Sequence, residues 1–367
     1  MSERLTAIYH VTAGAAAIEA RARGIAVEQS VEMPVEGIDD PYVLNDIVGR
    51  VEAITDLGTG RFEVRIGLAT ATIAGDAGQL FNMLFGNTSI QDGIDLVDAE
   101  LPASLVDAFP GPNLGTPGLR ALAGAPARAL TSGALKPQGL PPAGLAAIAA
   151  RMAEGGIDLI KDDHGLADQP YSPFIARVDA VTSALDRVAA RTGHRTQYLP
   201  SLSGTLDAMR AQIRHGIACG IPAFLIAPLI AGLPSFATLV REFPAAGFMT
   251  HPTLSGIARI APPLFYGKLF RMIGADAVVY PNHGGRFGYS PATCTALAAA
   301  ARAPWRHIKP ALPVPAGGMT QARIGEMLDF YGPDTIVLIG GALLATRERL
   351  THEVAAFVDT VARHQFA

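Results

Sequence analysis

The sequence is poor in the residues that mark secreted, nucleic-acid-binding or membrane-spanning proteins. Two cysteines and one tryptophan occur among 367 residues, and charged residues make up only 17% of the chain. Two cysteines cannot build the disulfide framework of a small secreted domain, so we expect a reducing cytoplasm. Because free cysteines are usually buried, Cys219 and Cys294 are both predicted to be small core residues.

Charge and hydropathy exclude further classes of partner. No run of lysine and arginine occurs and the formal net charge is -4, so we expect no nucleic-acid partner. The N-terminus shows no basic-then-apolar signal segment. The apolar stretch 221–233 contains prolines and falls short of the ~20 residues that span a bilayer, so we expect no membrane partner. An anionic substrate would then be held by local devices such as backbone amides, a metal or a few cations.

The chain does have length and apolar material, with 49% hydrophobic residues. Near the N-terminus, strand patterns at Leu5–Val11 and Gly60–Gly67 and a helical pattern at Asp76–Phe85 predict a small α+β, ferredoxin-like domain. The Pro/Gly-rich passage Phe109–Gly118 indicates a domain junction. We therefore place an N-terminal domain at residues 1–112 and a catalytic domain at residues 113–367.

After the junction, short apolar runs alternate with Ala-rich stretches of helical length, such as Pro142–Glu154 and Tyr171–Thr192. Eight runs are strand candidates: Ala129–Leu135, Ile157–Lys161, Thr196–Leu202, Ala223–Leu229, Gly247–His251, Ala277–Tyr280, Pro310–Val314 and Thr335–Ile339. Eight βα units in roughly 250 residues predict an α/β fold of the (β/α)8 TIM-barrel type. A doubly wound sheet is disfavoured, because no Gly-x-Gly-x-x-Gly follows the first strand.

Polar residues follow the predicted strands at the end where barrel enzymes carry their active sites. Asp163 and His164 suit a divalent cation, although a purely structural ion cluster around Lys161 would look the same. Lys136 ends the first strand and is either a desolvated base or a solvated lysine. Paired glycines follow the last two strands, where backbone amides could approach an anion or simply form tight turns.

Three motifs resemble those of RuBisCO and RuBisCO-like proteins. The segment Gly155–His164, Gly-Gly-Ile-Asp-Leu-Ile-Lys-Asp-Asp-His, resembles the family's Gly-Gly-x-Asp-x-x-Lys-Asp-Asp. The segment Leu135–Leu140, Leu-Lys-Pro-Gln-Gly-Leu, is similar to Lys-Pro-Lys-Leu-Gly-Leu shortened by one residue. The glycine pairs stand where the family binds one phosphate, which implies phosphate-binding residues at Gly317, Gly318, Gly340 and Gly341.

The resemblance implies a set of roles. Lys161, carbamylated by CO₂, would hold Mg²⁺ together with Asp163 and His164. Lys136 matches the lysine that moves protons at the substrate carbon, and His251 matches the active-site histidine of the family.

The resemblance also implies an oligomer. In the small domain, Glu28 and Asn87 resemble positions that reach into the site of the partner subunit. A homodimer with active sites at the subunit interface is therefore expected.

Departures from the family pattern bear on the reaction. RuBisCO has Glu where His164 stands, so the metal site is less anionic and should be less selective for Mg²⁺. Pro252 replaces the Arg that binds the second phosphate. The loop Pro281–Tyr289 has no lysine to hold a newly formed carboxylate. We expect a sugar monophosphate substrate and no fixation of CO₂.

The remaining chemistry is intramolecular proton transfer through a metal-stabilised enediolate, with Lys136 or His283 moving protons. The chain looks most like the branch that isomerises 5-methylthioribulose 1-phosphate in methionine salvage. A decarboxylase of a branched 3-oxo sugar-acid phosphate and a diketo-methylthiopentyl-phosphate enolase are alternatives on the same scaffold. Two other classes remain, namely an inactive homologue with a binding or regulatory role, and a TIM-barrel aldolase with a Schiff-base lysine at Lys136 or Lys161.

Overall fold

The computed structural model describes residues 3–366, which form two compact units. One unit contains the residues up to Phe109 together with Leu254–Phe265, and the other contains Pro110–Thr253 and the residues from Tyr266 onward. Residues 254–265 therefore pack with the N-terminal unit although they follow a strand of the second one. The predicted boundary after residue 112 stays a prediction.

The first unit is a ferredoxin-like α+β domain, as predicted. Its strands and longer helices are β1 (Arg4–Thr12), α1 (Ile18–Glu28), β2 (Arg50–Asp56), β3 (Arg61–Ala69), α2 (Ala77–Phe85), β4 (Ile94–Glu100) and α3 (Ala103–Asp107). The strands form one antiparallel sheet in the order β2-β3-β1-β4, which is the arrangement of a split β-α-β-β-α-β unit. Short helical turns connect these elements: η1 (Val35–Gly37), η2 (Val43–Ile47), η3 (Thr70–Thr72), η4 (Asn87–Ile90) and η5 (Ser255–Ile257).

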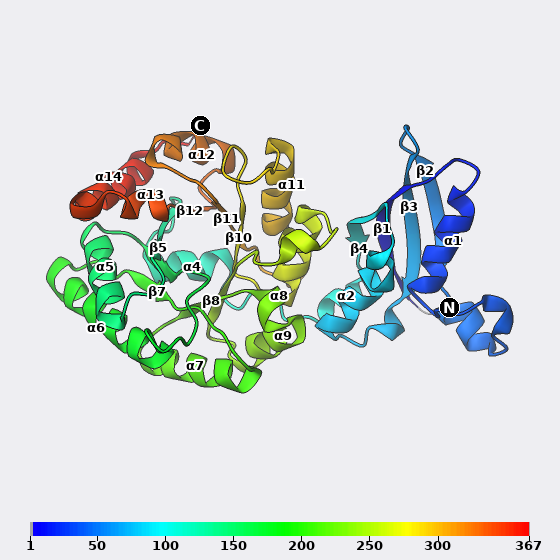
Figure 1. Ribbon diagram of the computed structural model, residues 1–367, viewed down its shortest axis with the longest axis horizontal. Helices are drawn as coiled ribbons and strands as arrows, with labels where there is room; N and C mark the ends of the chain where they lie inside the picture. The colour runs from blue at the N-terminus through cyan, green and yellow to red at the C-terminus, as the bar shows by residue number, and fades with distance from the viewer. Residues whose placement is uncertain (1–2, 367) are drawn as a thin grey trace. The chain divides into compact units, whose positions relative to one another are not determined.

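The second unit contains eight parallel strands, one at each predicted position (Figure 1). They are β5 (Leu130–Leu135), β6 (Leu159–Asp162), β7 (Gln197–Leu199), β8 (Ala223–Ile226), β9 (Gly247–Thr250), β10 (Ala277–Pro281), β11 (Leu312–Ala316) and β12 (Ile336–Leu338). Hydrogen-bond ladders join them in two groups of four, β12-β5-β6-β7 and β11-β10-β9-β8.

Helices surround these strands in Figure 1. They are α4 (Gly115–Ala123), α5 (Pro142–Glu154), α6 (Phe174–Thr192), α7 (Leu206–Ala218), α8 (Pro228–Ala231), α9 (Leu233–Glu242), η6 (Pro263–Phe270), α10 (Arg271–Ile273), α11 (Pro291–Arg302), η7 (Gln321–Arg323), α12 (Ile324–Tyr331), α13 (Gly341–Leu344), η8 (Arg347–Arg349) and α14 (Leu350–Arg363). The predicted helix 142–154 has these bounds in the structure, and α6 begins three residues later than predicted because Pro173 is its N-cap.

Two seams close the two groups into a barrel, which confirms the predicted fold class. At the first seam the Leu225 amide donates to the Pro200 carbonyl (2.9 Å). At the second seam β11 and β12 lie in contact without a ladder. The alternation of β11 explains this, because the Leu312 amide faces β10 and so Pro313 and Pro315 face β12 with no N–H to donate.

Alternate residues of every strand fill the barrel. One hydrophobic cluster joins all eight strands and the helix α4: Leu119, Ala123, Ala125, Leu130, Leu159, Leu199, Ala223, Leu225, Met249, Ala277, Val279, Leu312, Val314, Ile336 and Leu338. Because side chains alternate across a strand, these residues fix which positions at the strand ends point inward.

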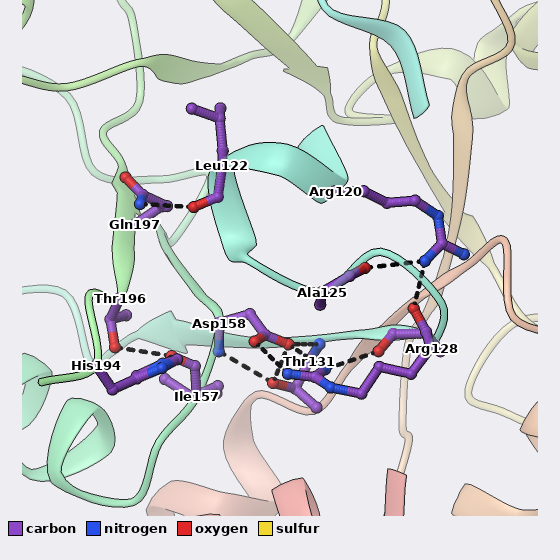
Figure 2. Close-up of polar contacts among 11 residues, drawn as sticks. Arg120, Leu122, Ala125, Arg128, Thr131, Ile157, Asp158, His194, Thr196 and Gln197 are labelled. Atoms are coloured by element: carbon purple, nitrogen blue, oxygen red, sulfur yellow. Dashed lines mark hydrogen bonds and ion pairs between the residues drawn. The ribbon is translucent and has the colours of Figure 1, made fainter. Parts of the chain in front are cut away.

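A polar network ties the start of β6 to the start of β5, at the end of the barrel opposite to the predicted site (Figure 2). The fully buried carboxylate of Asp158 accepts two hydrogen bonds from the Arg128 guanidinium, both 2.7 Å, and two from the amide and hydroxyl of Thr131, both 2.8 Å. Oδ2 accepts three of these four hydrogen bonds and Oδ1 accepts the fourth, so both oxygens of the buried charge are paired.

The structure also bears on the two cysteines and on membrane-spanning helices. Cys294 is buried as predicted, but the prediction that Cys219 is a core residue is wrong, because its side chain is partly exposed at the end of α7. Within residues 3–366, no helix combines the length and apolarity needed to cross a bilayer.

Replacing the buried carboxylate should strongly destabilise the barrel. Asp158→Ala leaves the Arg128 charge without its partner, so we expect the free energy of unfolding to fall by about 3–5 kcal/mol. The matched change Asp186→Ala breaks an exposed pair with Arg195 (N–O 3.0 Å) and should cost less than ~1 kcal/mol. Urea denaturation of both variants measures the difference, and equal losses would contradict this role of Asp158.

Candidate active site at the C-terminal ends of the barrel strands

The pleat of β6 places two of the predicted site residues on the inner side of the barrel. Leu159 belongs to the interior cluster, so Lys161 and then Asp163 follow on the same side. Asp162 takes the opposite side, where its carboxylate is held by the Arg177 guanidinium (3.1 Å) and the Tyr198 hydroxyl (2.7 Å). The two adjacent aspartates therefore have different roles. Asp162 anchors β6 to α6, and Asp163 lies at the opening of the barrel.

Lys161 is a buried lysine, only 3% exposed. Its Nζ donates to the Asp162 carbonyl (2.9 Å). Burial lowers its pKa to about 8, and the nearby charge of Lys136 acts in the same direction while Asp163 opposes it. A lysine in this state has a much larger neutral fraction near physiological pH than an exposed one. Only a neutral amine can react as a nucleophile.

Asp163 brings the predicted residues together. Its Oδ1 accepts a hydrogen bond from Lys136 Nζ (2.7 Å) and lies 3.2 Å from His164 Nδ1. Burial by itself would raise the pKa of Asp163, but the hydrogen bonds from His164 and Lys136 and the charge of Lys161 outweigh it, so the pKa lies well below its usual range. The carboxylate is therefore ionised near neutral pH.

Two histidines stack beside this carboxylate. The rings of His164 and His251 are 4.3 Å apart and nearly parallel, with 8° between their planes. His251 Nδ1 lies 2.6 Å from the Thr253 hydroxyl. Burial first, and then the charges of Lys161 and His164, lower the pKa of His251 to about 2, so its imidazole is neutral. Thr253 was not singled out from the sequence, although its place two residues after His251 could have suggested this contact.

The paired glycines lie in the turns after β11 and β12. Gly317 and Gly318 both have a φ of +92°, which favours glycine, and a Cβ at Gly318 would meet the Arg286 side chain. Gly340 has a different position: a Cβ there would lie 3.9 Å from Cε of Lys136. The turn after β12 therefore lies next to Lys136, which directly follows β5, as the pairing of these two strands requires.

The contacts of the other predicted residues involve different partners. His283 packs its ring against Phe330 of α12, with centroids 4.5 Å apart. Its Nδ1 is 4.0 Å from a Glu326 oxygen, and its Nε2 is buried with no hydrogen-bond partner among the described residues. In the small unit, the Asn87 amide donates to the Glu28 carboxylate (3.0 Å), so these two predicted residues do lie together.

Comparisons with known proteins identify the family. The family model "Ribulose bisphosphate carboxylase large chain, catalytic domain" matches residues 117–279. A protein of Rhodospirillum rubrum named 5-methylthioribulose-1-phosphate isomerase is 63% identical over 363 residues, which cover 99% of this chain and 97% of that protein. A crystal structure of a Rubisco-like protein from Rhodopseudomonas palustris, 50% identical, superposes with a TM-score of 0.93 and covers 100% of both chains. The chain belongs to the family of RuBisCO-like proteins.

A more distant relative carries the name of a different enzyme. The 2,3-diketo-5-methylthiopentyl-1-phosphate enolase of Geobacillus kaustophilus is 30% identical over 315 residues, covering 80% of this chain and 76% of that protein. The relatives are thus named as an isomerase and an enolase. The family assignment and the two-domain fold expected from the sequence motifs are confirmed.

The buried lysine should bind CO₂ in a pH-dependent way. Because the neutral amine is the reactive form and the pKa of Lys161 is lowered to about 8, binding of ¹³CO₂ at a fixed concentration should increase as the pH rises through 8. Carbon NMR of the protein with ¹³C-labelled bicarbonate follows the carbamate signal. Lys161→Met should remove it and the control Lys268→Met should keep it. A signal that survives in Lys161→Met would contradict the assignment.

Proposed function

We propose that this protein isomerises 5-methylthioribulose 1-phosphate, as a step of methionine salvage in the cytoplasm, and does not fix CO₂. The observation that carries the proposal is the Lys136–Asp163 contact beside buried Lys161, in a chain 63% identical to a protein named for this reaction. The reaction moves a carbonyl along the sugar chain by removing a proton from one carbon and returning it to another.

We further propose that Lys161 as its carbamate, Asp163 and His164 hold Mg²⁺. The donor set fits: the lysine is buried with a lowered pKa, and the aspartate is ionised and 3.2 Å from the imidazole. When bound, the ion would polarise the carbonyl and hydroxyl oxygens of the substrate. Since one ligand is an imidazole, we expect Mn²⁺ or Co²⁺ to replace Mg²⁺ more readily than at an all-oxygen site.

Lys136 is the residue proposed to move the proton. Its side chain is 36% exposed, so a substrate can reach the amine, while Asp163 fixes the position of Nζ. The neutral ring of His251 lies next to the cluster and can donate a hydrogen bond to a substrate oxygen, or accept one from a substrate hydroxyl, without adding charge. His283 is a second candidate for proton transfer, because its buried Nε2 has no partner within the described residues.

One phosphate is proposed to bind at the turns Gly317–Gly318 and Gly340–Gly341. These turns follow neighbouring strands, and the second lies beside Lys136, so a phosphate there would place the reacting carbon near the amine. Pro252 offers no donor for a second phosphate, which favours a monophosphate over a bisphosphate substrate.

We also propose a homodimer in which Glu28 and Asn87 serve the site of the partner subunit. In this chain the two side chains form one exposed hydrogen-bonded group with Glu32, and the Asn87 amide donates to both carboxylates at 3.0 Å. Such a group holds its carboxylates in place while leaving them accessible to a second copy.

The direct test is turnover of the proposed substrate. Incubation with Mg²⁺, bicarbonate and 5-methylthioribulose 1-phosphate should give an isomeric pentulose phosphate, followed by phosphorus NMR. Lys136→Met keeps the length of the side chain but removes the amine, so conversion should fall by about 10²–10⁴-fold. The control Lys268→Met should retain it. Turnover of the diketo phosphate alone would replace the isomerase by an enolase, and no turnover of any sugar phosphate would favour an inactive homologue.

A methyl group at the phosphate turn tests the second part of the proposal. A Cβ at Gly341 meets no heavy atom within 4 Å, so Gly341→Ala should fold normally yet obstruct an anion that approaches the backbone. We expect KM to rise roughly tenfold, which corresponds to about 1.4 kcal/mol of lost binding. Gly325→Ala on α12, where a Cβ also meets nothing, is the matched control. Unchanged KM in Gly341→Ala would contradict phosphate binding at this turn.

A further inference from the structure

A second cluster of potential metal ligands lies on the outer helices of the barrel. Asp179 belongs to α6, His215 lies in the last turn of α7, and Cys219 is the C-cap residue of α7. In residues 3–366 this is the one group of three His, Cys, Asp or Glu residues whose ligand atoms all lie within 4.8 Å of one another. None of the three belongs to the predicted active site.

The three ligand atoms face a common centre. His215 Nε2 lies 2.7 Å from Asp179 Oδ1, Cys219 Sγ lies 3.5 Å from the same oxygen, and Cys219 Sγ lies 3.6 Å from His215 Nε2. His215 and Cys219 are four residues apart, so one turn of α7 places both on the side that meets Asp179.

This geometry does not fit a nucleophilic cysteine. In a Cys-His-Asp triad the thiol and the carboxylate use the two different nitrogens of the imidazole. Here both contact the same nitrogen, Nε2 of His215. Burial first, and then the hydrogen bond to Asp179, also raise the pKa of the Cys219 thiol, which is the opposite of what activates a nucleophile.

The distances do fit a tetrahedral zinc ion. With Zn–S of ~2.3 Å and Zn–N and Zn–O of ~2.0–2.1 Å, tetrahedral ligands lie ~3.5–3.6 Å apart for sulfur with nitrogen or oxygen, and ~3.3 Å apart for nitrogen with oxygen. The two sulfur distances already match. Only the 2.7 Å between His215 Nε2 and Asp179 Oδ1 would have to open, by about 0.6 Å.

Ligand chemistry points to the same class of ion. A thiolate with an imidazole selects zinc, cobalt or copper over magnesium and calcium, which prefer oxygen. A thiolate and a carboxylate together neutralise a divalent charge. Because Asp179 is exposed and the other two residues are partly exposed, solvent can reach the cluster and water can complete the coordination.

We propose that Asp179, His215 and Cys219 form a binding site for a divalent transition metal, zinc above all, that links α6 to α7. The site shares no residue with the proposed Mg²⁺ site. Metal binding at it can therefore be measured independently of any catalytic turnover. Its function is to tie two neighbouring outer helices together, so that the bound ion stabilises the folded barrel.

Cobalt is the probe that tests this site, because a thiolate bound to Co²⁺ gives a near-ultraviolet charge-transfer band that oxygen and nitrogen ligands do not give. The full-length reduced protein, stripped of metal, is titrated with Co²⁺. We expect one equivalent to produce this band, and Zn²⁺ to abolish it by displacement. Mg²⁺ in excess should leave the band unchanged.

The second cysteine supplies the matched control. Cys219→Ser should abolish the band, whereas Cys294→Ser should keep it. His215→Gln should weaken cobalt binding at least tenfold, with the exposed His352→Gln as its control. Zinc should raise the melting temperature of the wild-type protein and of Cys294→Ser by more than that of Cys219→Ser. No band in the wild-type protein, or a band that persists in Cys219→Ser, would overturn the proposal.

Discussion

One carboxylate, Asp163, lies among three cationic or titratable groups, and the proposed chemistry depends on it. The hydrogen bonds from Lys136 and His164 hold its pKa well below the usual range, so it stays ionised although it is largely buried. Its charge in turn fixes the position of the Lys136 amine and partly offsets the burial of Lys161. Removing this carboxylate would take away the hydrogen-bond acceptor of Lys136 and a negative charge that favours the protonated form of Lys161.

The barrel provides this arrangement through the pleat of its strands. On β5 and β6, the same side that buries Leu130 and Leu159 in the interior ends in Lys136 and Lys161. The apolar interior removes water from Lys161 and so lowers its pKa, while Lys136, at the rim, remains open to a substrate. The same alternation of side chains therefore packs the barrel interior and places the proposed active-site lysines, and the buried network around Asp158 holds the opposite end of the same strands.

Much of the fold could be predicted from the sequence. The features that could not be predicted were hidden for physical reasons. The eight barrel strands are short apolar runs, buried on both sides, so their pattern is strong. The edge strand β2 was missed because most of its residues are exposed and it has little hydrophobic signal. The packing of residues 254–265 with the N-terminal unit depends on long-range contacts such as Leu96 with Ile260. Similarly, the contact of Cys219 with Asp179 joins two helices and has no local signal.

The cluster at the barrel opening was also only partly predictable from the sequence. Its members follow strand ends and match family motifs, which is why Lys136, Lys161 and Asp163 could be named in advance. The stacking of His164 on His251 depends on how two distant strands are placed around the barrel. Only the folded chain brings these rings together.

We propose that this cluster enolises a sugar monophosphate, and exchange of substrate protons with solvent is the sharpest experiment on that proposal. The protein is incubated in D₂O with 5-methylthioribulose 1-phosphate, with and without Mg²⁺ and bicarbonate, and proton NMR follows the carbon-bound hydrogens. We expect deuterium in the recovered sugar phosphates, dependent on the metal and lost in Lys161→Met. Absence of exchange with metal and substrate both bound would contradict it.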